Sequence, residues 1–289
     1  MIIGHQKQWQ FLKKSLELNR IFHSYLFSGL SSLGKKTLAL EFIKLINCGS
    51  RQEGPCNKCN SCRMIDKKIH PDLFIISPSG TGQEPSIKIS QIRKLQHFLR
   101  LRPYYGNLKS VILDESERMT KEAQSCLLKS LEEPKERNLL FLISDFADQL
   151  LPTIRSRCQT VKFFPVSLLE IENYLLKQGL SEKKSEFLAS ISYGKPGRII
   201  EFLSHPQELD KENKVLKEIL KVYNADLATR LQYVKNLTLT KEKARGVLEI
   251  LQRYLRSILI SGKGPTVKIK QNIKNGYLNF KDELIIIKK

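Results

Sequence analysis

The chain has 289 residues, with 49 Lys and Arg against 29 Asp and Glu, which gives a net charge of +20. This charge favours a polyanionic partner such as nucleic acid, or else it reflects a merely basic surface. Its length predicts two or three domains, and its longest apolar runs, 139–144 and 284–287, are far below the roughly 18–20 residues that span a bilayer. The first 14 residues lack the apolar run and cleavage site of a signal peptide, so we expect a cytoplasmic protein without membrane contact.

The first predicted element is a strand over the apolar residues 25–27, followed by a glycine loop and a helix with apolar residues at helical spacing over 38–46. The loop runs from Gly29 to Gly34-Lys35 and matches the first seven positions of a phosphate-binding P-loop. In such a loop the glycines let backbone N–H groups surround phosphates, and the lysine meets their charge. The pattern therefore predicts a nucleotide-type site.

The eighth loop position departs from that pattern. A P-loop has Ser or Thr there to hold Mg²⁺, but this chain has Lys36, with Thr37 one place late. An ammonium group would compete with magnesium, so we expect a degenerate site at which bound ATP and Mg²⁺ are doubtful. Three alternatives stay open: a one-residue slip that restores Thr37 as ligand, a glycine turn without a phosphate role, and nucleotide binding without hydrolysis.

Four of the six cysteines fall within 15 residues. They are Cys48, Cys56, Cys59 and Cys62. This grouping favours a metal over disulfides, and four thiolates fill a tetrahedral Zn²⁺ site without leaving an open position. We therefore predict a structural rather than a catalytic zinc. His70 is a further ligand candidate, but four sulfurs leave it no vacancy.

The next predicted strands cover 73–76, 111–113, 139–143 and 161–164. Between them we predict one helix with inner-face residues Ile89, Ile92, Leu95 and Phe98, and another from the N-cap Thr120 to Pro134 with inner-face residues Ala123, Cys126, Leu127 and Leu131. Strands that alternate with helices at this spacing predict an α/β fold, with an open, mostly parallel sheet and helices on both faces. Ligand sites in such a sheet lie at the carboxyl ends of the strands.

The third strand ends in Asp114 and Glu115. In P-loop ATPases two such carboxylates bind Mg²⁺ and polarise the attacking water, although an Asp-Glu pair after a strand is common in itself. The carboxylates are intact while the phosphate loop is not. We give the altered loop more weight than the carboxylates, because a carboxylate that acts as the base has little to act on without Mg²⁺ at the γ-phosphate.

Arg155 and Arg157 follow the fourth strand. An arginine can stabilise charge on a transferred phosphoryl group when a neighbouring subunit supplies it. The alternative is a surface arginine that caps a helix or pairs with a carboxylate, and the residues alone favour that alternative.

From residue 165 onward the pattern is helical. Helices are predicted over 168–177, 183–190, 197–203, 210–223, 227–236 and 241–260, with breaks near 194–197 and 204–207. These breaks predict a small helical lid over 166–206 and an all-α C-terminal domain over 207–289. We assign no role to the basic tail, 261–289.

In this order the motifs resemble the AAA+ clamp loaders of the bacterial DNA polymerase III holoenzyme, relatives of replication factor C. The resemblance covers most of residues 1–205. Beside the P-loop and the cysteines, it is carried by Gly4-His5-Gln6, His23 to Phe27, Leu127 to Pro134, Ser156-Arg157-Cys158 and Gly194 to Arg198. It implies an AAA+ P-loop NTPase-like domain over 1–165 with an inserted zinc module at 48–62, then the lid, then a collar domain for oligomerisation.

Both the ATP-hydrolysing gamma/tau type and the delta prime type of subunit are similar to this chain. Lys36 favours the delta prime type, as does the lack of an Ile-Asp-Ala-Ala-Ser-Arg stretch after His70-Pro71-Asp72. The resemblance implies a hetero-oligomer with gamma/tau and delta subunits, which acts on a sliding clamp and primer-template DNA. It also implies that Arg157 acts in trans on a gamma/tau site, which reverses the preference for a merely structural arginine. Ser144 and Arg198 match the sensor 1 and sensor 2 positions.

We therefore expect a component of the DNA polymerase III holoenzyme that has no ATPase activity of its own. Two alternatives stay open: an active gamma/tau-like ATPase, and a zinc-bearing nucleic-acid-binding protein that retains an AAA+ fold.

Overall fold

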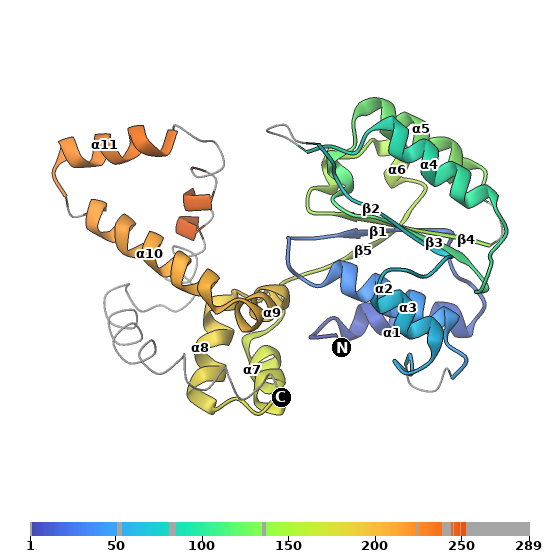
Figure 1. Ribbon diagram of the computed structural model, residues 1–289, viewed down its shortest axis with the longest axis horizontal. Coiled ribbons are helices and arrows are strands. Elements are labelled where there is room, and N and C mark those ends of the chain that lie inside the picture. Colours follow the sequence, from blue (N-terminus) through green and yellow to red (C-terminus); the bar gives the residue numbers. More distant parts are fainter. Residues whose placement is uncertain are drawn as a thin grey trace. The chain divides into compact units, whose positions relative to one another are not determined.

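The computed structural model describes residues 2–50, 54–80, 85–134, 137–223 and 225–238, with isolated positions between 244 and 252 (Figure 1). The chain divides into two compact units, residues 1–167 and 168–289. A further division of the second unit at residue 206 stays a prediction. No helix within the described ranges combines the length and the apolar character needed to cross a bilayer.

A five-stranded parallel sheet forms the centre of the first unit. The strands lie in the order β2-β3-β4-β1-β5. They are β1 (Ser24–Ser28), β2 (Leu73–Ile76), β3 (Lys109–Leu113), β4 (Asn138–Ser144) and β5 (Gln159–Lys162). The predicted α/β fold with a parallel sheet is thus confirmed. The fifth strand begins and ends two residues earlier than predicted, and Phe164, which the prediction included, is 64% exposed.

Helices cover both faces of this sheet (Figure 1). On one face lie α1 (Gln6–Glu17), α2 (Lys35–Asn47) and α3 (Asn60–Asp66), and on the other lie α4 (Ile89–Arg100), α5 (Lys121–Glu132) and α6 (Pro152–Arg155). Two 3₁₀ turns, η1 (Ser116–Arg118) and η2 (Ala147–Gln149), follow β3 and β4. The sequence prediction did not include α1 and α3.

Alternate residues of the central strands supply the two cores. Tyr25 and Phe27 of β1 pack with Phe141 of β4 in the core under α1 and α2, and the rings of Tyr25 and Phe141 are stacked at 5.4 Å. Leu26 and Leu140 point to the other core, which α4 and α5 cover. Because both faces are buried, these strands are continuous apolar runs, as is usual for parallel sheets.

The second unit is helical over its described residues. It contains α7 (Leu168–Lys177), α8 (Glu182–Ser192), α9 (Pro196–Ser204), α10 (Pro206–Tyr223) and α11 (Leu227–Thr238). The predicted break over 204–207 is reduced to His205, because Pro206 starts α10, and the fixed φ of proline suits the first turn of a helix. The helix predicted over 241–260 and the tail over 261–289 lie largely or wholly outside the described residues.

Candidate nucleotide site and cysteine cluster

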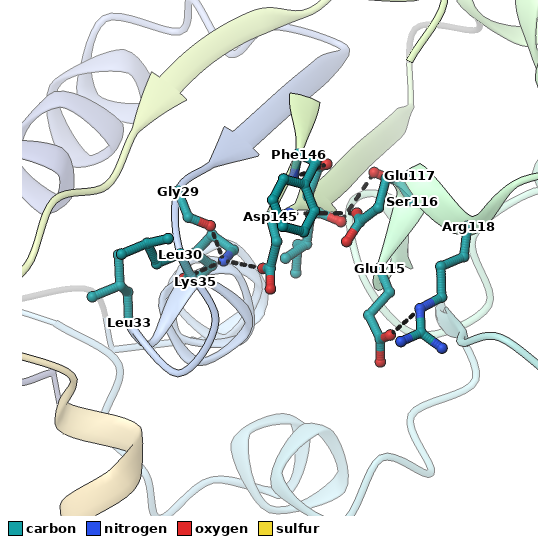
Figure 2. A network of polar contacts seen from close by, with 12 residues as sticks. Gly29, Leu30, Leu33, Lys35, Glu115, Ser116, Glu117, Arg118, Asp145 and Phe146 are labelled. Carbon is teal, nitrogen blue, oxygen red and sulfur yellow. Dashed lines mark hydrogen bonds and ion pairs between the residues drawn. The ribbon is translucent and has the colours of Figure 1, made fainter. Parts of the chain in front are cut away.

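The candidate nucleotide site lies where β1, β3 and β4 end. These strands are neighbours in the sheet and run parallel, so their carboxyl ends meet at one edge. The glycine loop follows β1 and Asp145 follows β4 (Figure 2). Asp114 directly follows β3. The sequence-predicted loop, carboxylates and sensor 1 position therefore converge.

Two glycines shape the loop. Gly29 has a φ of 147°, and a Cβ there would lie 2.4 Å from the carbonyl oxygen of Phe163, so a side chain would collide with backbone. Gly34 has a φ of 90° and is the N-cap of α2, a left-handed position that suits glycine. His5 also contacts the loop, because its Nε2 forms a hydrogen bond of 2.8 Å with the carbonyl oxygen of Leu33.

The P-loop lysine is bound by the protein itself. The Nζ of Lys35 donates hydrogen bonds to the carbonyl oxygens of Gly29 at 2.6 Å and Leu30 at 2.7 Å, and to Oδ1 of Asp145 at 2.8 Å (Figure 2). Its side chain is 5% exposed. An ammonium group has three donors, and all three are used here. Asp145 was not predicted, although its place directly after the fourth strand is a usable signal.

Lys36 lies against the carboxylate that would hold magnesium. Its Nζ is 2.8 Å from Oδ2 of Asp114, and both side chains are partly exposed. A positive charge thus lies beside the carboxylate that P-loop ATPases use for the cation. Thr37, the alternative ligand, lies within the first turn of α2 and is exposed.

The second carboxylate also has a partner. Glu115 has a left-handed backbone with a φ of 50°, and its Oε2 lies 2.8 Å from Nε of Arg118 (Figure 2). Ser144 is fully buried; its Oγ accepts a hydrogen bond from the N–H of Phe146, and its carbonyl accepts one from the N–H of Gly29. Ser144, the predicted sensor 1 residue, is therefore joined directly to the glycine loop.

Arg157 lies at the opposite edge of the sheet. It precedes β5, and its carbonyl oxygen accepts a hydrogen bond from Oγ of Ser24, the first residue of β1. The glycine loop follows the far end of β1, about 13 Å along that strand. The guanidinium of Arg157 pairs with Oε1 of Glu132 at 3.0 Å and donates to the carbonyl oxygen of Thr153 at 3.1 Å.

The four predicted cysteines meet in one cluster. Their sulfur atoms all lie within 4.8 Å of one another. Backbone N–H groups of Cys56, Cys59 and Cys62 donate to the sulfurs of Cys48, Cys56 and Cys59, respectively. In a tetrahedral site with Zn–S bonds of about 2.3 Å the sulfurs lie about 3.8 Å apart, so this donor set is compatible with a structural zinc.

The surroundings of the cluster favour thiolate at one position. N–H groups of Lys58 and Cys59 directed at the Cys56 sulfur lower the pKa of that thiol to about 6. Burial raises the pKa of the Cys62 thiol. His70 is not part of the cluster, and its Nδ1 accepts a hydrogen bond from the N–H of Asp72.

A buried lysine of α2 binds the cysteine segment, which we define as residues 48–66. The Nζ of Lys44 contacts Oε1 of Glu41 at 2.6 Å, Oδ1 of Asp66 at 2.8 Å and Oδ1 of Asn57 at 2.8 Å. Burial opposes the charge of Lys44, but the carboxylates of Asp66 and Glu41 outweigh it and raise the pKa of Lys44. Sequence reasoning missed this residue, because a lysine on an amphipathic helix usually faces solvent.

The family model described as "DNA polymerase III, delta subunit" matches residues 4–167, which is more than half of the chain. The chain belongs to this family. A relative named DNA polymerase III subunit delta' from Bacillus subtilis is 33% identical over 72% of this chain and 62% of its own length, and one of the same name from Pseudomonas aeruginosa is 37% identical over 47% and 41%. The tau subunit of Escherichia coli DNA polymerase III is 32% identical over 59% of this chain and 26% of its own length. The chain thus matches less than two thirds of each of these relatives.

In this member of the delta family, the fold brings together most of the predicted site residues. The glycine loop, both carboxylates and Ser144 share one edge, and the cysteines form a second centre. Arg157 stands at the other edge of the sheet. Arg198 belongs to the second unit, where its guanidinium lies over the rings of Phe202 at 4.9 Å and Tyr193 at 5.7 Å.

Proposed function

We propose that this chain is a delta prime-type subunit of the DNA polymerase III clamp loader, that it does not hydrolyse ATP, and that it supplies Arg157 to the ATP site of a neighbouring gamma/tau subunit. The observation that carries the proposal is the ion pair between Lys36 and Asp114. Hydrolysis in a P-loop ATPase depends on Mg²⁺ that bridges the phosphates and neutralises developing charge. Here a protein cation neutralises the carboxylate that would recruit the metal.

The other groups of the site support the same proposal. Lys35 donates all its protons to loop carbonyls and Asp145, so phosphate would have to displace three contacts. Glu115, which would polarise the water, is paired with Arg118. A nucleotide could still be held by loop amides, but the groups that split it are engaged elsewhere.

The position of Arg157 supports a role in another subunit. Because it lies at the amino edge of the sheet, the length of β1 separates it from the glycine loop of its own chain. Its ion pair with Glu132 does not prevent such a role, since the two side chains are 37% and 49% exposed. An exposed pair contributes only about 0–1 kcal/mol, so moving the guanidinium to a phosphate costs little.

The cysteine cluster would hold a structural zinc. Cys48, Cys56, Cys59 and Cys62 would supply all four ligands, which leaves no position for a substrate or a reactive water. When bound, the metal would tie the segment after α2 to α3. The proposed partners are gamma/tau and delta subunits, and through the complex the clamp and primer-template DNA, which places the protein in the cytoplasm.

A second candidate is a gamma/tau-like ATPase, favoured by the similarity to the E. coli tau subunit and by the presence of both carboxylates. ATP turnover by the purified chain separates the candidates. We expect no Mg²⁺-dependent turnover above background from the chain alone, and stable assembly with gamma/tau and delta subunits. Appreciable turnover by the chain alone would contradict the proposal and favour the motor subunit.

A further inference from the structure

Away from the nucleotide site, the loop before β3 presents two tyrosines to solvent. Tyr104 is 84% exposed and Tyr105 is 53% exposed. Leu101, at the start of the same loop, is 53% exposed, and Ile69 before β2 is 66% exposed. Large apolar side chains at such exposure suggest a contact surface when they gather in one place.

A buried carboxylate holds this loop in shape. Asp72 accepts hydrogen bonds from the N–H groups of Tyr104 at 2.7 Å, Tyr105 at 2.7 Å and Gly106 at 2.8 Å. Its charge is balanced by Lys109, whose Nζ is 3.3 Å away. Three successive backbone groups bound to one carboxylate leave the loop little freedom. The tyrosines are therefore presented at low entropic cost to a ligand.

The loop is also fixed against the cysteine segment. The hydroxyl of Tyr105 accepts a hydrogen bond from Nδ2 of Asn60, which follows Cys59 directly, and its ring meets the edge of His70 at 5.9 Å. A Cβ at Gly106 would lie 2.0 Å from Oδ1 of Asn47, so the chain there packs closely against the end of α2. Because Ile69 directly precedes His70, the segment that carries Ile69 ends beside Tyr105.

The charges around these tyrosines are basic. Lys67 and Lys68 precede Ile69, Arg100 and Arg102 flank Leu101, and all four are exposed. Of the carboxylates near this surface, Asp72 pairs with Lys109, Asp66 shares Lys44 with Glu41, and Glu133 lines a pocket together with Arg100. The four cations outnumber the carboxylates that could offset them. The surface therefore combines exposed aromatic rings with an excess of positive charge.

We propose that this aromatic–basic surface binds single-stranded nucleic acid. It consists of Lys67, Lys68, Ile69, Arg100, Leu101, Arg102, Tyr104 and Tyr105. The basic side chains would contact phosphates, and an unstacked base would stack on the exposed ring of Tyr104. The surface favours a single strand over a duplex, because bases inside a duplex are already stacked on one another. We favour nucleic acid over an acidic peptide, because each nucleotide offers both a phosphate for the basic side chains and a base ring for the exposed tyrosine.

The proposal is independent of Arg157 and of the nucleotide loop, so it is tested on the full chain without ATP. Fluorescence anisotropy with oligo-dT and oligo-rU of about 16 nucleotides, at several salt concentrations, measures the affinity. The Tyr104→Leu variant should bind about tenfold more weakly, within the range for loss of one stacked base, while Tyr104→Phe should match the wild type. The oligonucleotide that binds more tightly shows whether the surface prefers single-stranded DNA or RNA.

Two variants that each remove one positive charge test whether the position of the charge matters. Arg102→Gln should weaken oligonucleotide binding by at least threefold and reduce its salt dependence. Lys121→Gln removes an equal charge at the exposed start of α5 and should change the affinity less than twofold. A duplex of the same length should bind without sensitivity to residue 104. Equal oligonucleotide affinity of Tyr104→Leu and wild type would overturn the proposal. So would equal effects of the two charge variants, or a Tyr104→Leu defect confined to assembly with protein partners.

Discussion

Lys44 offers a sharp test of how the cysteine segment is held. Lys44→Met keeps the length of the side chain and removes the ammonium that contacts Glu41, Asp66 and Asn57. Glu41 would lose this ion pair while its side chain stays only 10% exposed, and removing one partner of a buried pair costs about 3–5 kcal/mol. Asp66 is 52% exposed and can be hydrated instead, so loss of its ion pair with Lys44 should cost only about 0–1 kcal/mol, as is typical of surface pairs. We therefore expect a loss of about 3 kcal/mol in the free energy of unfolding.

For a unit of the size of residues 1–167, that loss lowers the melting temperature by about 6–12 °C. Thermal unfolding of the zinc-loaded, reduced full chain, followed by circular dichroism, measures the shift. Asn57 lies between two of the cysteines with a left-handed φ of 55°, so loss of its Lys44 contact should also speed zinc release to a chromogenic chelator. Lys121→Met, at an exposed position, is the control and should change neither quantity. A Lys44→Met melting temperature within about 2 °C of the wild type, with unchanged zinc release, would show that Lys44 does not hold the cysteine segment in place.

Three further predictions concern the loop, the buried acid and the metal. Lys36→Thr removes the ammonium from Asp114 and supplies a hydroxyl, so calorimetry should show at least about a tenfold gain in Mg-ATP affinity; no gain would mean that Lys36 does not block the site. For Asp72, burial alone would raise the pKa, but the N–H groups of Tyr104, Gly106 and Tyr105, with Lys109, outweigh it and lower the pKa. The stability that Asp72 contributes is present above the unfolded pKa of about 4 and is lost as pH falls through the folded pKa. The Asp72→Asn variant should therefore be less stable than the wild type at pH 7, and its stability in urea denaturation should fall less steeply toward acid pH. Parallel pH profiles of the two proteins would contradict this. Reduced, chelator-free protein should contain one zinc per chain, and chelation should lower its melting temperature, whereas much less than one zinc per chain would refute the cysteine assignment.

Regular patterns made the fold and much of the site predictable. The apolar runs that became β1, β3 and β4 indicated buried parallel strands, and the rule that ligands lie at the carboxyl ends of such strands placed the glycine loop beside Asp114. The spacing of the cysteines was enough to predict one cluster. The helix α1 could have been predicted as well, because Trp9, Leu12 and Leu16 lie on one side of it and pack into the core.

The remaining contacts depend on tertiary structure that no local pattern encodes. Lys35 is 110 residues from Asp145, and Asp72 is 32 to 34 residues from the N–H groups that it binds. Such pairs exist only once the strands are aligned. The sequence also could not predict that Glu115 takes a left-handed conformation and pairs with Arg118, because non-glycine residues adopt that conformation infrequently.

The proposed role of Arg157 across a subunit interface can be measured as ATP turnover by the mixed loader. Loader is assembled from gamma/tau and delta subunits with the wild-type chain, with Arg157→Ala, or with Arg155→Ala, which removes an equal charge from the same segment. After equal assembly is established, we expect Arg157→Ala to lower turnover by about 10³-fold or more at the adjacent site and Arg155→Ala to leave it within about twofold. Turnover of the Arg157→Ala loader equal to that of the wild type would show that Arg157 does not act at the neighbouring ATP site.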